Sequence, residues 1–254
     1  MISLYRESRS HSLGIEEIES YLEEKLSARV TVKKGLLRET HAQVLARLRV
    51  LDIYRPFTPN EPLPGEIAYE KRVLDGDVSP RGILYDGLRL QEIYREELPR
   101  EERGLRNVHI IFTDRFIGTY DEDDRRYHGR VIVLGYPTVI SLTGLVEAPA
   151  KPREYYIARR LGDAVAEKVL EDLGDRYLDY DDPRTPEVLK GYAMQGVFYQ
   201  LLGEAFCPYR GCRLFNAHWQ EEVLRAQLTR PEFCEKHGEM LKELRRKLKK
   251  FLRH

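Results

Sequence analysis

Three cysteines and one histidine near the carboxyl end of the chain have the residue types and the spacing of a zinc site. Cys207, Cys212, Cys234 and His237 read C-x4-C-x21-C-x2-H, and the chain has no other cysteine. Thiolates and an imidazole in two short pairs, separated by one intervening element, form a closed tetrahedral zinc site. The alternative is three unrelated cysteines, two of them in the core. We predict that these four side chains bind one zinc ion with a structural role.

The bulk composition narrows the classes of function. The 254 residues include 42 basic and 42 acidic side chains, so the formal net charge is zero and gives no global reason to bind nucleic acid or a membrane. No stretch approaches the roughly 18 apolar residues of a membrane span. The first residues do not read as a signal peptide, and an odd number of cysteines argues against a disulfide framework. We therefore expect a cytoplasmic protein.

Hydrophobic periodicity predicts strands and helices alternating early in the chain, and helices late. Strands are expected at 2–6, 28–32, 107–112, 129–134 and 137–142. Helices are expected at 15–26, 40–51, 85–98, 152–173 and 185–202. A proline-rich segment (55–80) and a charged segment (113–127) are expected to be irregular.

This order of elements indicates a single α/β (α+β) domain over residues 1–254, with a sheet-rich part (1–150) and a helical part (151–254). The helix expected at 185–202 has clear end signals. Pro186 suits its first turn, and Gly203 suits a left-handed residue at its end.

The segment from Gly196 to His237 resembles the carboxyl-terminal half of the archaemetzincins, which are relatives of metzincin zinc peptidases. Their pattern is H-E-x-x-H-x-x-G-x-x-H-C-x4-C-x-M, followed about twenty residues later by F-C-x-x-C. The segments 212–220 and 144–152 also resemble a prokaryotic family regarded as metallopeptidases. The resemblance implies a metzincin-like domain with a mixed twisted sheet, long helices and a structural zinc site near the carboxyl end.

Aligned on Cys207, several positions match that pattern. Gly203 falls on the glycine at which the helix breaks, and Phe233 with Cys234 matches the second cysteine pair. His237 replaces the last cysteine, and Leu214 replaces the methionine beneath the catalytic metal.

The catalytic positions do not match. The three metal histidines fall on Gly196, Gln200 and Phe206, and the general-base glutamate falls on Val197. Glycine, valine and phenylalanine neither ligate zinc nor transfer a proton, so this helix would not hold the catalytic metal. The resemblance therefore implies a retained structural zinc and a lost catalytic one.

The remaining histidines have fewer potential metal ligands near them in the sequence. His218 and Glu221 form an H-x-x-E pair that could be an alternative ligand or a second site, although two ligands fall short of a zinc site. His218 could also replace His237 as the fourth ligand. His109, on an apolar strand, is expected to be a hydrogen-bonded core residue, and His128 is expected in a solvated charged loop.

Three hypotheses of function follow. The first is an archaemetzincin relative without peptidase activity that binds an extended peptide or protein. The segment 141–147 resembles the edge strand that metzincins offer for strand addition, and a core strand that runs into a turn explains it equally well. The second is a metal-dependent hydrolase with a rebuilt site that uses His218, Glu221, Glu204 or residues of the loop 113–128. The third is an RNA or protein interaction module that uses the basic stretch 242–254, which has seven Lys or Arg and one Glu. A terminal helix with one packed face explains that stretch equally well.

Overall fold

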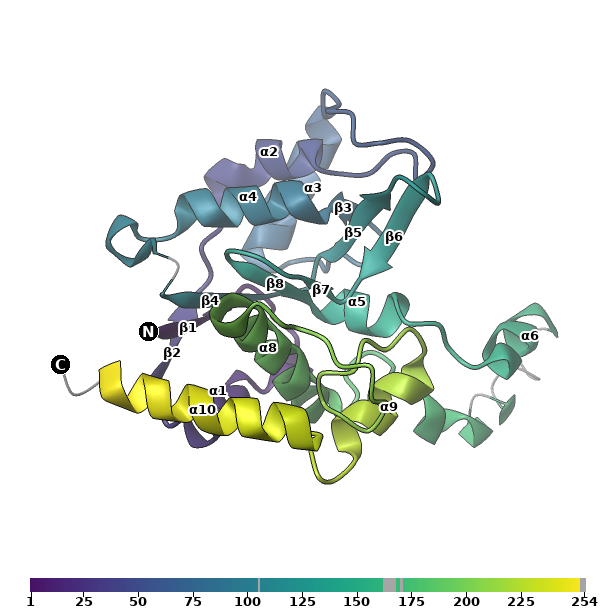
Figure 1. Ribbon diagram of the computed structural model, residues 1–254. Helices are drawn as coiled ribbons and strands as arrows, with labels where there is room; N and C mark the ends of the chain where they lie inside the picture. Colours follow the sequence, from purple (N-terminus) through teal and green to yellow (C-terminus); the bar gives the residue numbers. More distant parts are fainter. Residues whose placement is uncertain (105, 162–167, 170, 252–254) are drawn as a thin grey trace.

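The computed structural model describes residues 1–104, 106–161, 168–169 and 171–251 and has the mixed α/β architecture expected from the sequence (Figure 1). Its strands are β1 (Ile2–Arg6), β2 (Val30–Lys34), β3 (Leu84–Asp86), β4 (Val108–Thr113), β5 (Phe116–Asp121), β6 (Arg126–Arg130), β7 (Ile132–Val133) and β8 (Thr138–Ser141). Its helices are α1 (Ile15–Leu26), α2 (Ala42–Arg47), α3 (Pro64–Asp75), α4 (Gly87–Glu97), α5 (Leu142–Glu147), α6 (Arg153–Leu161), α8 (Thr185–Leu202), α9 (Gln220–Leu228) and α10 (Glu235–Phe251). Within the described ranges, no helix has the length and apolar character needed to cross a bilayer.

The main sheet has the strand order β2-β1-β4-β8-β7. β1 runs parallel to β2 and to β4, and β4 runs parallel to β8. β7 pairs antiparallel with β8 and is left at the edge. A smaller sheet has the order β3-β5-β6. The parallel strands β1, β4 and β8 therefore end at the same edge of the main sheet.

Helices cover both faces of the main sheet. α1, α8 and α10 lie on one face, and α2, α3 and α4 lie on the other (Figure 1). The residues of β4 alternate between the two cores: Ile110 and Phe112 pack with α1 and α8, whereas Ile111 packs with α2 and α4. A strand covered on both faces reads as a continuous hydrophobic run, which explains the sequence of β4.

His109 in β4 is a core residue, as its apolar surroundings in the sequence predicted. Its Nδ1 lies 3.2 Å from the hydroxyl of Tyr5, and its Nε2 lies 3.2 Å from the carbonyl oxygen of Glu102. Both ring nitrogens therefore have partners, and burial lowers the pKa of the imidazole.

The prediction of an irregular segment at 55–80 is wrong in its second half, which forms α3. Pro64 occupies the first turn of that helix, and the Glu66 carboxylate accepts a hydrogen bond from the backbone N–H of Leu63 at 2.8 Å. These are ordinary start signals for a helix. The density of prolines nearby obscured them.

The prediction that the charged segment 113–127 is an irregular loop is also wrong. Its residues form β5 and the start of β6, which pair antiparallel in register from Ile117 opposite Arg130 to Asp121 opposite Arg126. The strand expected at 129–134 is correspondingly divided between β6 and β7. His128 therefore lies in a paired strand, and its Nε2 is 2.8 Å from the carboxylate of Asp124.

Three predicted helices have different bounds. The one expected at 85–98 starts later because Leu84–Asp86 form β3, and the one expected at 40–51 is reduced to α2. The helix expected at 152–173 is described as α6 in its first half, while residues 162–167 and 170 of that prediction lie outside the described residues.

The carboxyl-terminal helix α10 packs along α1 (Figure 1). Leu241, Leu244 and Leu248 belong to the core cluster on that side of the sheet. The guanidinium of Arg245 donates to the hydroxyl of Ser27, at the end of α1. The apolar stripe of this basic helix is therefore used in packing within the molecule.

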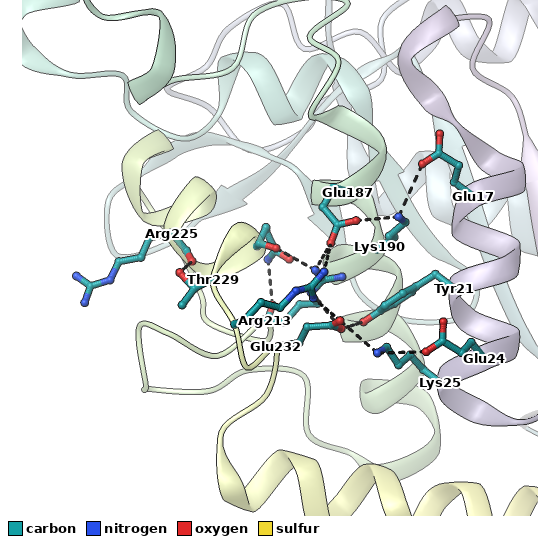
Figure 2. Close-up of polar contacts among 12 residues, drawn as sticks. Glu17, Tyr21, Glu24, Lys25, Glu187, Lys190, Arg213, Arg225, Thr229 and Glu232 are labelled. Carbon is teal, nitrogen blue, oxygen red and sulfur yellow. Dashed lines mark hydrogen bonds and ion pairs between the residues drawn. The ribbon is translucent and has the colours of Figure 1, made fainter.

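A buried arginine links the cysteine region to the helices of the sheet (Figure 2). Arg213 follows Cys212 directly, and its side chain is fully buried. Its guanidinium forms an ion pair with Glu187 in α8 and donates to the carbonyl oxygen of Gln227 at 2.9 Å. It also lies 3.7 Å from a carboxylate oxygen of Glu232.

The ring of Tyr21 in α1 completes the surroundings of this guanidinium, whose centre lies 5.0 Å from the ring centroid. Tyr21 also donates a 2.7 Å hydrogen bond to Glu232. Burial alone would raise the pKa of Glu187, but hydrogen bonds from Lys190 and Arg213 lower it overall. Both carboxylates are therefore charged at neutral pH and compensate the buried cation.

Replacing Arg213 with Met should lower the free energy of unfolding by about 3–5 kcal/mol, because it leaves two partly buried carboxylates without their cation. Urea denaturation measures the loss. Arg225 in α9 is exposed and serves as the matched control. Arg225→Met should change stability by no more than about 0.5 kcal/mol. Equal stabilities of the two variants would contradict the central role of Arg213.

Candidate functional site

The structure brings Cys207, Cys212, Cys234 and His237 together. One ligand atom from each lies within 4.8 Å of the others. The sulfurs of Cys207 and Cys234 are 3.8 Å apart, and His237 Nδ1 lies 3.1 Å from the Cys234 sulfur and 3.7 Å from that of Cys212. Two sulfurs bound to one tetrahedral zinc at about 2.3 Å each are about 3.8 Å apart. The spacing fits a four-coordinate zinc site.

Local structure explains how the four side chains meet. Gly203, in the left-handed conformation with φ of 73°, ends α8 and turns the chain toward Cys207. The loop to Cys212 is closed by a 3.0 Å hydrogen bond from the Cys212 N–H to the Tyr209 carbonyl oxygen. Cys234 immediately precedes α10, so His237 lies in the first turn of that helix.

A carboxylate orients the histidine. His237 is fully buried, and its Nε2 lies 3.0 Å from Glu204 Oε1. The other ring nitrogen, Nδ1, faces the sulfurs. Glu204 also pairs with Lys236. Histidines that bind metals commonly donate their second N–H to a carboxylate, which fixes the ring and its tautomer. Nδ1 is therefore the candidate ligand atom.

The protonation of the thiols is consistent with a site for a cation. Burial raises the pKa of the Cys207 thiol to about 12, and the neighbouring thiols of Cys212 and Cys234 contribute to that rise. Burial also raises the pKa of Cys212. The N–H of Tyr209 lies 3.4 Å from the Cys207 sulfur and favours the thiolate. A divalent metal stabilises several thiolates at once, which the protein atoms alone do not.

A cleft of about 380 Å³ lies beside this cluster, between the edge strand β7 and the amino-terminal half of α8. Tyr192 and Gln195 of α8 line one wall, and Phe206 and His218 come from the cysteine region. Gln195 is 1% exposed; its Nε2 is 3.4 Å from the Phe215 carbonyl oxygen, and its Oε1 has no partner among the described residues.

The residues aligned with the catalytic ligands of the archaemetzincin pattern are dispersed. Gly196 faces Thr138 of β8, because a Cβ placed there would be 3.0 Å from that side chain. Val197 is fully buried in the core. The amide of Gln200 donates to the Asn107 carbonyl oxygen, whereas Phe206 lines the cleft.

His218 and Glu221 belong to no group of three or more potential metal ligands among the described residues. His218 is exposed and lines the cleft. Glu221 instead accepts a 2.5 Å hydrogen bond from Arg176. Among the described residues, the only group of three or more potential ligands is the one formed by the cysteines and His237.

The interpretation of 141–147 as an edge strand is wrong, and the alternative, a core strand that ends and turns, is closer to the structure. Ser141 ends the interior strand β8, and its hydroxyl accepts the N–H of Gly144 and so caps α5, which occupies 142–147. The edge strand is β7, on the other side of the 134–137 turn. Its two residues lie within the strand expected at 129–134, but its place at an edge of the sheet depends on strand order, which the sequence did not show.

Residues 1–244 match the model of a family described as "Probable metallopeptidase family (DUF6775)". The chain belongs to this metallopeptidase family. The relationship to metallopeptidases expected from the sequence is thereby confirmed. No curated protein matches the chain significantly.

Two solved structures are similar to this member of the metallopeptidase family. A zinc-dependent peptidase from Methanocorpusculum labreanum (strain Z) is 14% identical, with a TM-score of 0.48, and the match covers 95% of this chain and 100% of that one. Archaemetzincin from Methanopyrus kandleri is 17% identical, with a TM-score of 0.47 and coverage of 96% and 93%.

Metal analysis distinguishes the two candidate histidine ligands. Protein purified without added zinc should contain about one zinc per chain, and His237→Ala should lose it because three ligands hold the ion weakly. His218→Ala should keep it, since that side chain lies in the cleft. Emission spectrometry gives the stoichiometry. Loss of zinc from His218→Ala alone would show that the fourth ligand is misassigned.

Removing the carboxylate that orients His237 should weaken zinc binding without abolishing it. Glu204→Gln should lower the zinc affinity about 10- to 100-fold, as changes to such outer partners typically do. Competition with a chromogenic chelator measures the affinity. The control is Glu239→Gln. It removes an exposed carboxylate that pairs with Lys242 on α10, the helix that carries His237. An affinity equal to that of the control would contradict the role given to Glu204.

Proposed function

We propose that this protein binds an extended peptide in the cleft beside β7 and does not hydrolyse it by the metzincin mechanism. One zinc ion, held by Cys207, Cys212, Cys234 and His237, has a structural role. On this proposal the chain is an archaemetzincin relative that keeps the structural half of the family's two metal sites.

The observation that carries the proposal is the chemistry of the cleft walls. The described residues that line the cleft include one imidazole, that of His218, and no carboxylate or thiol. A zinc peptidase needs about three metal ligands and a carboxylate that moves protons. These walls instead carry aromatic, amide and aliphatic groups, together with the guanidinium of Arg130, which donates to the hydroxyl of Thr119. Such walls suit binding of a peptide.

Strand addition is the binding mode that the cleft favours. β7 is the last strand of the main sheet and lines the cleft through Ile132 and Val133. An extended peptide that pairs with an edge strand gains backbone hydrogen bonds there. Gln195 lies on the opposite wall with a buried, unpaired amide oxygen. That oxygen would accept an N–H of the peptide, which removes the cost of leaving it unpaired.

The structural role of the zinc follows from its donor set. Four protein ligands, mostly buried, close the coordination sphere, and catalytic zinc sites keep one position open for water. The metal would join the segment after α8 to the start of α10. It would thereby fix Phe206, next to Cys207, on the wall of the cleft.

A pool of unstructured decapeptides tests for binding without cleavage. Fluorescence polarisation measures the affinity of the protein for the peptides, and mass spectrometry shows whether the peptides are cleaved. Bound peptides should stay intact. Gln195→Leu should weaken binding about tenfold, since it removes a buried hydrogen-bond acceptor. Tyr199→Phe, an exposed change on the same helix, should have no effect.

Two results would overturn this proposal. The first is the absence of peptide binding by the zinc-loaded protein. The second is cleavage that EDTA abolishes and that His218→Ala also removes, which would favour a hydrolase with a rebuilt site around the imidazole in the cleft.

A further inference from the structure

A second and larger cavity, of about 750 Å³, lies at the carboxyl ends of the parallel strands. It is lined by the segment that follows β1, by Asp114 and Arg115 after β4, by the first turns of α5, and by residues before α8. It shares no lining residue with the cleft beside β7.

The topology of the sheet explains why a cavity forms there. The chain leaves β1 through α1 and returns as β2 on one side, whereas from β4 it passes through β5, β6 and β7 and returns as β8 on the other side. Connections that diverge from two adjacent parallel strands leave a crevice outside their carboxyl ends, where ligands of open α/β sheets bind. In this chain the crevice lies between the ends of β1 and β4.

The ends of β1 and β4 are joined by polar contacts that give the cavity a fixed floor. The hydroxyl of Ser8 donates to Asp114 Oδ1 at 2.5 Å, and the N–H of Arg9 donates to Asp114 Oδ2 at 2.7 Å. Glu7 accepts the N–H of Leu37 at 2.8 Å. These two carboxylates are therefore used within the protein.

Other charged groups around the cavity are also paired. Arg6 pairs with Glu16, and Arg115 pairs with the buried Glu70. Arg81 stacks on the ring of Tyr180, with its guanidinium carbon 3.8 Å from the centroid, and lies 3.7 Å from Asp181.

Two opposite charges remain available to a ligand. The guanidinium of Arg9 donates to the carbonyl oxygen of Leu74 at 2.6 Å and has no carboxylate within 4.0 Å among the described residues. The carboxylate of Asp179 accepts the N–H of Tyr180 and has no cation within that distance in the described part of the chain. Arg9 reaches the end of α3, whereas Asp179 lies before α8, so the two charges come from different layers.

We propose that this cavity binds a small zwitterion, such as an amino acid or a short peptide with free ends, whose carboxylate pairs with Arg9 and whose ammonium group pairs with Asp179. Both charges are exposed to solvent at the rim of the cavity, and a purely anionic or purely cationic ligand would pair with only one of them. The volume is that of an ordinary small-molecule site. The proposal is independent of peptide binding in the cleft.

Calorimetric titration of the full-length, zinc-loaded protein with triglycine tests the assignment, because triglycine carries both charges and no side chain. The wild type should bind triglycine and should not bind N-acetyltriglycine amide, which carries neither charge. Arg9→Gln and Asp179→Asn should each weaken binding about tenfold or more, as expected for loss of one charge-assisted hydrogen bond.

The control is Arg89→Gln, an exposed arginine paired with Glu92 on α4, which should bind triglycine like the wild type. Any of three results would overturn the proposal. The wild type does not bind triglycine, it binds N-acetyltriglycine amide with equal affinity, or Arg9→Gln and Asp179→Asn both bind triglycine as the wild type does. If Gln195→Leu weakens triglycine binding and Arg9→Gln does not, the ligand lies in the cleft, and the zwitterion site is wrong while the proposed cleft function stands.

Discussion

The burial of the Arg213 guanidinium is the constraint on which the arrangement of the carboxyl-terminal half depends. A cation removed from water has to be compensated by charges held in place, and here they come from α8 through Glu187 and from the segment before α10 through Glu232 (Figure 2). Because Arg213 follows Cys212, the same contacts fix the middle of the cysteine region. The candidate zinc site is therefore attached to the sheet through an ion-pair network as well as through its own ligands.

This attachment connects the metal cluster to the cleft. Phe206 precedes a ligand, and His218 lies a few residues after Arg213, so both side chains take their positions from the segment that the cluster and Arg213 hold. The opposite wall comes from β7 and α8, which belong to the main body of the fold. One wall of the cleft thus depends on the sheet, and the other depends on a short segment that has little secondary structure of its own.

Much of the fold and of the metal cluster could be predicted because the signals are local. The glycine after α8, the hydrophobic run of β4 and the spacing of the four ligands each have a direct physical meaning. The hairpin of β5 and β6 was missed because charged residues fill the turn between its strands and extend into β6, and because the two strands are stabilised by pairing with each other. Glu204 was not assigned as the partner of His237, because nothing in a sequence shows which carboxylate a buried ring nitrogen will meet. The cavity at the ends of β1 and β4 depends on strand order, which no local pattern encodes.

The geometry also shows how the cluster of cysteines and His237 is compatible with the residues that α8 carries. Gly203 connects α8 to the cluster. Its left-handed conformation ends the helix whatever side chains lie earlier on α8. Gly196 allows close contact with Thr138, and Val197 fills the core, so both positions serve the packing of α8 on the sheet. Histidines there would bring polar rings into that packing unless a metal compensated them. In this chain, therefore, apolar packing of α8 on the sheet and a cluster of four potential ligands beyond Gly203 are mutually compatible.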